Sequence, residues 1–212
     1  IGLQYILTQS GPMTMAASLG TGFLRTESHL ETPDIQFHIQ PFSADMPSTR
    51  THAFSAFTAS VLQLRPESTG FLTLKSPNYN DHPDIHPNYL ATDTDCRTIV
   101  KAVQMARRIV EYEPLKKHVL EEYAPGGHVA FDHEQATLDW VRQTAVTIYH
   151  PTGTCKMGTD EMSVVNPSLK VRGVDCLRVA DASIMPKITS GNTNAPAIMI
   201  GEKASDLILK EA

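Results

Sequence analysis

Residues 33–42 read PDIQFHIQPF, and apolar and polar side chains alternate along this stretch. The two interleaved sets are Ile35, Phe37 and Ile39, and Gln36, His38 and Gln40. A period of two is typical of a β-strand with one face in the core and one face in solvent. We therefore predict a half-buried strand here, with its two glutamines and its histidine facing solvent.

The chain around this strand predicts more strands and several helices. Residues 57–76 (FTASVLQLRPESTGFLTLKS) hold two strands joined by a turn at Pro66–Gly70, and we expect these consecutive strands to pair antiparallel. Short strands are also expected on both sides of Gly173. Strands mixed with helices, without a regular βαβ alternation, indicate the α+β class.

Helical periodicity recurs in five places. Helices are expected at residues 3–9, from Asp93 or Thr94 to Val110, from Pro114 to Gly126, from Asp132 to Thr147 with Gln135 completing a capping box, and in a closing stretch at 195–209. In the closing helix the predicted core residues are Ile198, Ala204, Leu207 and Ile208.

Composition excludes several classes of protein. The 212 residues carry a formal net charge of −5, which gives no electrostatic reason to bind nucleic acid. Three cysteines without a CxxC suit a reducing compartment, so we predict a cytoplasmic location. No apolar run approaches the roughly 20 residues that span a bilayer. Because Ile1 opens what reads as a helix in progress, we expect the chain to be a piece of a longer protein.

Three candidate sites are weak. Gly20 and Gly22 form a GxG pair, but no third glycine follows at the dinucleotide-binding spacing. His82, Asp84 and His86 would point the same way in an extended chain and could bind a metal ion, but no further ligand is evident, so no metal is predicted. Cys155 would need a base within hydrogen-bond reach to act as a nucleophile.

Two other stretches are richer in chemistry. Residues 149–158 (YHPTGTCKMG) place His150 between a helix end and a turn that Pro151 and Gly153 fix, where an imidazole could move protons. Residues 190–194 (SGNTN) form a polar loop that runs into a helix N-terminus, where free N–H groups favour a negatively charged oxygen. A capped helix needs only one of these polar side chains.

Together these stretches resemble the C-terminal region of the glucose–methanol–choline (GMC) oxidoreductases. The resemblance rests on YHPTGTCKMG, VVNPSLKVRGVDCLRVADASIMP and SGNTNAPAIMIGEKASDLIL, and is weaker over LQYILTQSGP, PDIQFHIQPF, LQLRPESTGFLTL and HPNYL. It is closest to the choline and alcohol dehydrogenase branch. The family is FAD-dependent and oxidises alcohols by hydride transfer to flavin N5.

The resemblance implies roles for individual residues. His150 matches the catalytic histidine, and Asn192 matches the second catalytic position, which is asparagine in the choline-type branch. Asp181, Ala182, Thr193 and Asn194 match segments that contact the flavin. The strands between about residues 35 and 75 are then expected to supply a wall of the substrate pocket.

The resemblance also implies a domain plan. Residues 1–34 would connect to a missing N-terminal FAD domain, 35–148 would form an antiparallel substrate-binding domain flanked by helices, and 149–212 would carry the catalytic loop and return to the Rossmann-like FAD domain as a strand, loop and helix. None of the 12 glycines falls in a GxGxxG motif, so we expect the chain alone to retain no FAD and to be inactive.

The expected partners are a primary alcohol, with a choline-like one included, and an electron acceptor, either a quinone or oxygen. Membrane association and oligomerisation of the parent protein are left open. Two alternatives also stay open: a flavin-containing enzyme of the hydroxynitrile lyase type, and a non-enzymatic metal-binding or interaction module around His82, Asp84 and His86.

Overall fold

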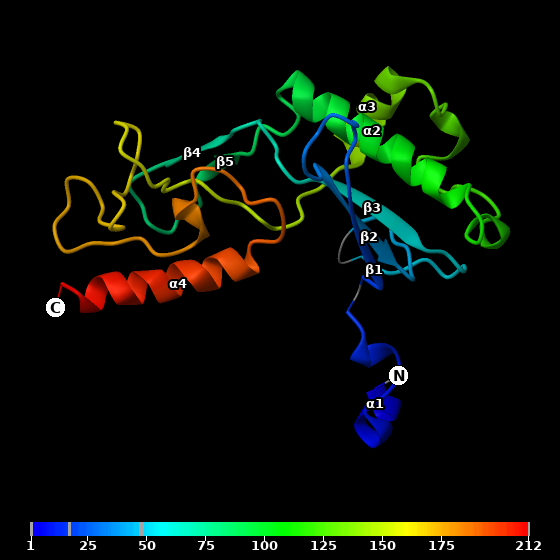
Figure 1. Cartoon of the computed structure of the whole chain (residues 1–212), viewed down its shortest axis with the longest axis horizontal. Coiled ribbons are helices and arrows are strands. Elements are labelled where there is room, and N and C mark those ends of the chain that lie inside the picture. The colour runs from blue at the N-terminus through cyan, green and yellow to red at the C-terminus, as the bar shows by residue number, and fades with distance from the viewer. Residues whose placement is uncertain (1, 17, 47–48, 212) are drawn as a thin grey trace. The chain divides into compact units, whose positions relative to one another are not determined.

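The structure is a computed structural model that describes residues 2–16, 18–46 and 49–211. Contacts between residues divide it into two units, each assembled from two separate segments of the chain. Unit 1 comprises residues 1–63 and 97–143, and unit 2 comprises residues 64–96 and 144–212. Helices and antiparallel strand pairs occur in both units (Figure 1), which confirms the predicted α+β class.

The sheet of unit 1 is built around the strand that the alternating pattern predicts. β1 (Gly20–Leu24), β2 (Ile35–Gln40) and β3 (Thr58–Gln63) are antiparallel in the order β1-β2-β3. In the register, Phe37 lies opposite Gly22 on β1 and Val61 on β3. The predicted strand is therefore confirmed, and it is the central one.

The solvent-facing side predicted for this strand is wrong at its first polar residue. Gln36 is only 3% exposed, and His38 and Gln40 are half-buried. A central strand has neighbours on both edges, and the first three residues of β2 are covered on both faces. Alternation of residue types reports which face is apolar, and it does not report whether the polar face is covered.

Helix α2 (Asp93–Val110) supplies the apolar cover of this sheet (Figure 1). Ala102 is fully buried against Ile35 and Phe37, and partly buried residues surround them. These neighbours are Val61, Ile99, Met105, Ala106 and Ile109. Apolar residues three and four positions apart lie on one helix face, which is why the periodicity identified this helix.

The helix predicted from Pro114 to Gly126 is wrong. This stretch forms only two single turns of 3-10 helix, η2 (Lys116–His118) and η3 (Gly126–His128). Leu120 is fully exposed and Tyr123 is 60% exposed, so the segment has no buried apolar face. A short helix without such a face gains too little from packing to offset its nucleation cost.

The next helix is shorter than predicted. α3 (Glu134–Thr144) begins after His133, whose Nδ1 accepts a hydrogen bond of 3.0 Å from the N–H of Ala136. The side chain of Gln135 instead donates to Asp139 within the helix. The predicted capping box is therefore replaced by a histidine cap.

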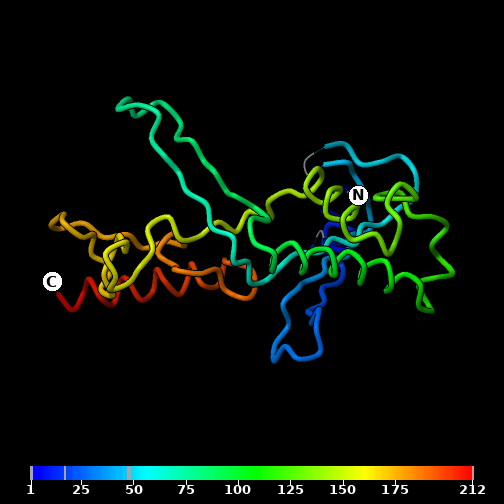
Figure 2. Tube along the Cα trace, turned by 90° about the horizontal axis from the view of Figure 1, so that it is seen from above, coloured from blue at the N-terminus to red at the C-terminus, as the bar shows by residue number. Residues whose placement is uncertain are grey.

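Strands β4 (Phe71–Thr73) and β5 (Asp84–His86) belong to unit 2 and pair with each other. The prediction that β3 and β4 pair is therefore wrong, because β3 pairs with β2. Figure 2 shows the chain around β4 and β5 as a long hairpin arm. Leu64, the residue after β3, is 3% exposed, and the chain changes unit at this point rather than folding back on β3.

The core of unit 2 lies between α4 (Asn194–Leu209) and the segments that precede it. Its buried members are Val165, Leu169, Ile184, Met185, Ile200 and Ala204. The strands predicted on both sides of Gly173 reduce to isolated bridges, of Val171 with Val165 and of Lys170 with Arg178.

The remaining elements are η1 (Pro12–Thr14), η4 (Ala182–Ile184) and helix α1 (Gly2–Thr8). Helix α1 confirms the helix predicted at residues 3–9. Leu3, Ile6 and Leu7 of α1 are each at least 70% exposed. Within the described residues, no helix combines the length and the apolar character needed to cross a membrane.

Candidate active site

His150 is presented by a chain segment that is fixed on both sides. Tyr149 has a positive φ of 63°, and its N–H donates to the Thr147 hydroxyl at 3.0 Å. Gly153 has a φ of 89°, a conformation that glycine adopts without steric cost. The imidazole itself is half-buried.

The motif that follows His150 is joined to the segment before α4. The N–H of Cys155 donates to the Ser183 carbonyl at 3.0 Å, and that of Met157 donates to the Ile184 carbonyl at 2.7 Å. Ile184 is in turn buried in the core of unit 2. These backbone bonds place the YHPTGTCKMG motif beside η4, although about 30 residues separate the two stretches along the chain.

The structure brings together the two residues predicted to be catalytic. Nδ2 of Asn192 lies 3.0 Å from Nε2 of His150. On the other side of the ring, Nδ1 of His150 lies 2.8 Å from the Thr193 hydroxyl. Thr193 is 9% exposed and Asn192 is exposed, so the ring is held from the protein side and its Nε2 edge opens outward with the amide.

The two ring nitrogens of His150 face different groups. Nε2 faces the Asn192 amide, and Nδ1 faces both the Thr193 hydroxyl and, at 3.5 Å, the Thr193 N–H. A hydroxyl can donate or accept, and a side-chain amide has a donor end and an acceptor end, so the partners of the ring fit either neutral tautomer. In the tautomer with the proton on Nδ1, Nε2 keeps the lone pair that a proton acceptor needs.

Thr193 has a role that the sequence did not reveal. It occupies the N-cap position of α4, yet its side chain makes no capping bond because its hydroxyl faces His150. The N–H groups of the first turn therefore have no cap from this residue, and the positive end of the helix dipole lies next to the pair. A threonine before a helix usually indicates a cap, so no sequence signal distinguished this use.

The other residues predicted to contact a cofactor lie at the starts of helices. Asp181 precedes η4 and accepts a bond of 2.8 Å from the N–H of Ser183. Bonds from the Ser183 side chain and then from its N–H lower the pKa of the Asp181 carboxyl below its usual range. Ala182 begins η4, and Asn194, which is exposed, begins α4.

The alternative metal site receives no support. Asp84 forms an ion pair of 2.8 Å with Lys75, and the ring of His86 stacks on Phe71 at 4.6 Å. Over residues 2–16, 18–46 and 49–211, no three His, Cys, Asp or Glu side chains are grouped as a metal ion would need. His150 does not serve as a base for Cys155, because the ring nitrogens of His150 face Asn192 and Thr193.

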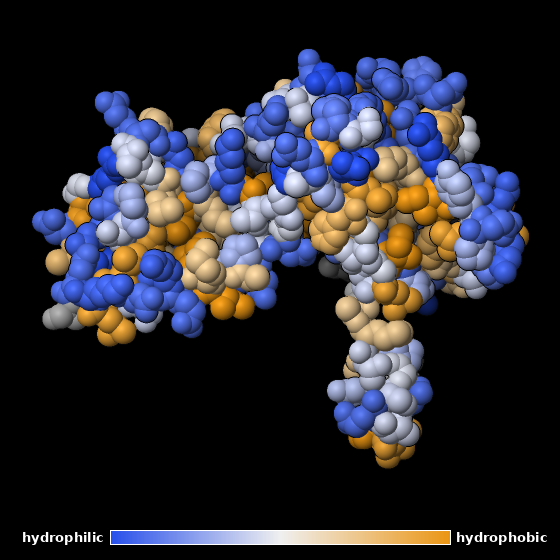
Figure 3. Space-filling model, in the orientation of Figure 1, coloured by the Kyte–Doolittle hydropathy of each residue, from blue (hydrophilic) through white to orange (hydrophobic). Residues whose placement is uncertain are grey.

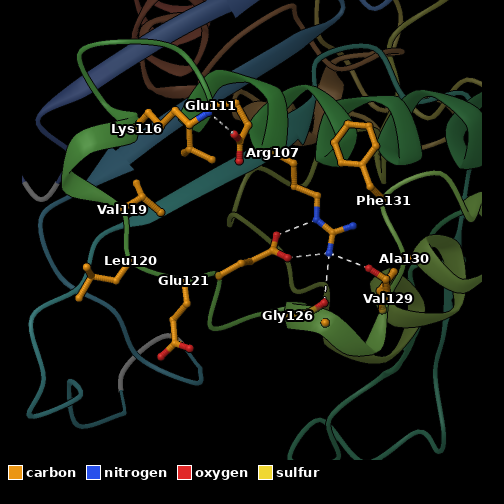
Figure 4. Close-up of a pocket in the computed structure, with 13 residues that line it drawn as sticks. Arg107, Glu111, Lys116, Val119, Leu120, Glu121, Gly126, Val129, Ala130 and Phe131 are labelled. Carbon is orange, nitrogen blue, oxygen red and sulfur yellow. Dashed lines mark hydrogen bonds and ion pairs between the residues drawn. The ribbon is translucent and has the colours of Figure 1, made fainter.

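A separate pocket of about 520 Å³ lies in unit 1, between the C-terminal half of α2 and residues 116–131 (Figure 4). Arg107 is one of its lining residues, and its Nε and Nη2 each donate to the Glu122 carboxylate at 2.7 Å. Nη2 also donates to the Val129 carbonyl at 3.0 Å. These bonds tie the irregular segment after α2 to the helix and make the arginine a structural residue.

Comparison with known proteins identifies the family of the chain. The model of the GMC oxidoreductase family matches residues 66–201, which include His150 and Asn192. The chain belongs to the GMC oxidoreductase family. The predicted resemblance is confirmed, and its closest branch agrees with the relatives described below.

Two curated relatives are similar to the chain over nearly its whole length. The chain is 39% identical to an alcohol dehydrogenase [acceptor] of Pseudomonas putida over 212 residues, which is 100% of this chain and 38% of that protein. It is 42% identical to the mitochondrial choline dehydrogenase of Mus musculus over 211 residues, which is 98% of this chain and 35% of that protein. The chain thus spans less than two-fifths of the relatives it matches.

Solved structures share the fold. Pyridoxine 4-oxidase from Mesorbium loti is 28% identical with a TM-score of 0.79, over 90% of this chain and 37% of that one. A formate oxidase is 24% identical with a TM-score of 0.87, over 100% of this chain and 41% of that one. The second likeness shows the fold alone.

Proposed function

We propose that the protein containing this chain is an FAD-dependent oxidoreductase that oxidises a primary alcohol to the aldehyde, with His150 as the base and Asn192 as the group that positions the substrate oxygen. The observation that carries the proposal is the 3.0 Å contact between these two side chains, which come from separate loops. Membership of the GMC family and the dehydrogenase names of the relatives support it.

The residues present fit a flavin. The first turn of α4 lacks a side-chain cap from Thr193 and offers N–H groups and a positive dipole end to a negatively charged ring edge. Asp181, Ala182, Thr193 and Asn194 are the residues proposed to hold the cofactor. When bound, the flavin supplies the acceptor for the hydride that leaves the alcohol carbon.

The chain's own residues then handle the proton and the oxygen. Nε2 of His150 takes the hydroxyl proton once the substrate oxygen enters between the ring and the Asn192 amide, and the contact of Nδ1 with the Thr193 hydroxyl holds the ring in place for this transfer. Nδ2 of Asn192 donates to the same oxygen without competing for the proton. The imidazolium that results can donate back to the oxygen as negative charge develops there.

The domain plan belongs to the same proposal. Residues 1–34 connect to an FAD domain, 35–148 form the substrate-binding domain, and 149–212 carry the catalytic loop and contribute a strand, loop and helix to the FAD domain. The substrate proposed is a small primary alcohol, with choline among those to test, and the final electron acceptor is a quinone or oxygen.

The test uses the full-length flavoenzyme under anaerobic conditions and measures loss of flavin absorbance after an alcohol is added. His150→Ala and Asn192→Ala should each slow this reduction by about 100-fold or more, the range of lost acid–base or oxyanion groups. His29→Ala, which removes an exposed imidazole in unit 1, is the control and should reduce at the wild-type rate.

Two results would contradict the proposal. Reduction of His150→Ala at the wild-type rate would remove the histidine from the chemistry. Release of cyanide from a hydroxynitrile, without any alcohol-dependent flavin reduction, would instead indicate the lyase reaction.

A further inference from the structure

Arg65 forms a long-range contact that the proposed chemistry does not use. It follows Leu64, which is 3% exposed, and its Nε donates to the Ser190 hydroxyl at 2.7 Å across 125 residues of sequence. Ser190 opens the SGNTN loop and lies two residues before Asn192. Two residues span at most about 7 Å of chain, so the guanidinium is bonded to the backbone segment that carries Asn192.

The backbone next to Arg65 is held rigidly. Asp95, at the start of α2, is 1% exposed, and its carboxylate accepts bonds from the N–H groups of Glu67 at 2.9 Å and Ser68 at 2.8 Å. The Ser68 hydroxyl also donates to this carboxylate and accepts from the N–H of Ala91 at 2.9 Å. Hydrogen bonds to a buried carboxylate are charge-assisted and therefore strong, so they fix the turn that carries Arg65.

The SGNTN loop is held differently at its two ends. Near its second end lies Thr193, which is buried and in contact with His150. Its first end is exposed, and the side chain of Ser190 is bonded there to Arg65. Gly191 lies between Ser190 and Asn192, and its N–H donates to the Thr189 carbonyl at 2.8 Å.

We propose that Arg65 is a positioning residue for Asn192, which acts by fixing the first end of the SGNTN loop through Ser190. This inference rests on the proposed function, because the ordered loop matters only if Asn192 takes part in oxidising the alcohol. The bond from Arg65 ends on Ser190, and Gly191 joins Ser190 to Asn192, so the effect of Arg65 is transmitted by the loop.

Positioning of this kind affects turnover. A displacement of about 1 Å in a catalytic group can cost on the order of 100-fold in rate, whereas one exposed hydrogen bond contributes little to stability. Loss of the Arg65–Ser190 bond should therefore lower kcat while it leaves the unfolding temperature nearly unchanged.

The experiment is a double-mutant cycle in the full-length flavoenzyme. Arg65→Met and Ser190→Ala should each lower kcat by about 10-fold, and the double variant should be no worse than the poorer single variant, because both remove one interaction. Arg65→Lys keeps a cationic N–H donor at the end of a long side chain and should recover most of the lost kcat. Arg25→Met is the matched control, since Arg25 is exposed and its Nη1 donates to the Leu30 carbonyl in unit 1 at 2.8 Å.

A second readout does not depend on activity. Amide hydrogen exchange of the peptide that contains residues 190–193 should become faster in Arg65→Met, and that of β2 should not change. If the wild-type enzyme oxidises no alcohol, the proposed function fails, and the exchange rates still decide whether Arg65 orders the loop.

Unchanged exchange in the loop would overturn the inference, as would additive losses of kcat in the double variant. An equal loss of kcat in Arg25→Met would also overturn it, because the effect would then be a general consequence of losing a surface arginine.

Discussion

Asp160 organises the turn that ends the histidine motif. Its carboxylate accepts a bond of 2.6 Å from the Ser163 hydroxyl and bonds of 3.0 Å from Lys156 Nζ and from the N–H of Met162. Ser163 is 3% exposed, and a Cβ at Gly158 would collide with its hydroxyl. The glycine is thus required by close packing, and the carboxylate by the donors that converge on it.

The same bonds make this turn sensitive to acid. The Ser163 hydroxyl and then Lys156 lower the pKa of Asp160 from 3.8 to about 2. Because the folded pKa is depressed, the contribution of Asp160 to stability is present above pH 3.8 and is lost as the pH falls towards 2. A carboxyl titration by NMR should give a midpoint near 2 for Asp160 and a higher one in Ser163→Ala; equal midpoints would contradict this assignment.

At the scale of elements, helix α4 carries apolar side chains on two faces. Only one of these faces packs against the core of unit 2. Ile200 is 4% exposed and Ala204 is 3% exposed, and Leu207 packs beside them. Ile198 and Ile208, which were predicted to face the core, are 61% and 47% exposed. Figure 3 shows hydrophobic atoms on the visible surface of this helix. With apolar residues on both faces, periodicity could not select the packed one.

The two faces can be distinguished by the same substitution at neighbouring positions. Ile200→Ala should lower the free energy of unfolding by about 2–4 kcal/mol, since it removes buried methylene groups and leaves a cavity. Ile198→Ala should change the free energy of unfolding by less than about 0.5 kcal/mol, because its side chain is exposed. Urea titrations followed by circular dichroism measure both values. Equal losses would mean that the packed face has been assigned wrongly.

At the scale of the whole molecule, each unit is closed by segments that are distant in sequence. Residues 64–96 are inserted between the two parts of unit 1, yet they pack with residues 144–212. The insertion brings Arg65 to the SGNTN loop, which a consecutive arrangement of the chain would not do. The chain spans under two-fifths of its relatives, so a complete flavin site is proposed only for a longer protein.

The chain by itself should therefore purify without colour. It contains the residues proposed for one side of a flavin, but none of its 12 glycines falls in the GxGxxG motif that grips the nucleotide portion. A visible absorption spectrum of the purified 212-residue chain should lack the flavin bands, whereas the full-length protein should show them. A stoichiometric yellow product from the chain alone would refute this expectation.

The sequence predicted well where a local rule was sufficient. The alternation in residues 35–40, the periodicity of α2 and the polar loop before α4 all correspond to elements of the structure. It failed where tertiary partners decide the outcome. The stretch 114–126 forms no α-helix, and its Tyr123 packs as a single ring on Phe54 at 5.3 Å rather than as part of an apolar helix face. β4 pairs with β5 and not with β3. Gln36 is buried because its strand is central in the sheet.

The sequence by itself determined the family and the α+β class and indicated His150 and Asn192 as candidates, because motifs and periodicities are properties of neighbouring residues. Only the tertiary structure decided that the side chains of His150 and Asn192 meet, that Thr193 contacts the imidazole and that Arg65 reaches the SGNTN loop. Hydrogen bonds depend on distance and direction in space, and a residue 125 positions away comes within reach only after the chain has folded.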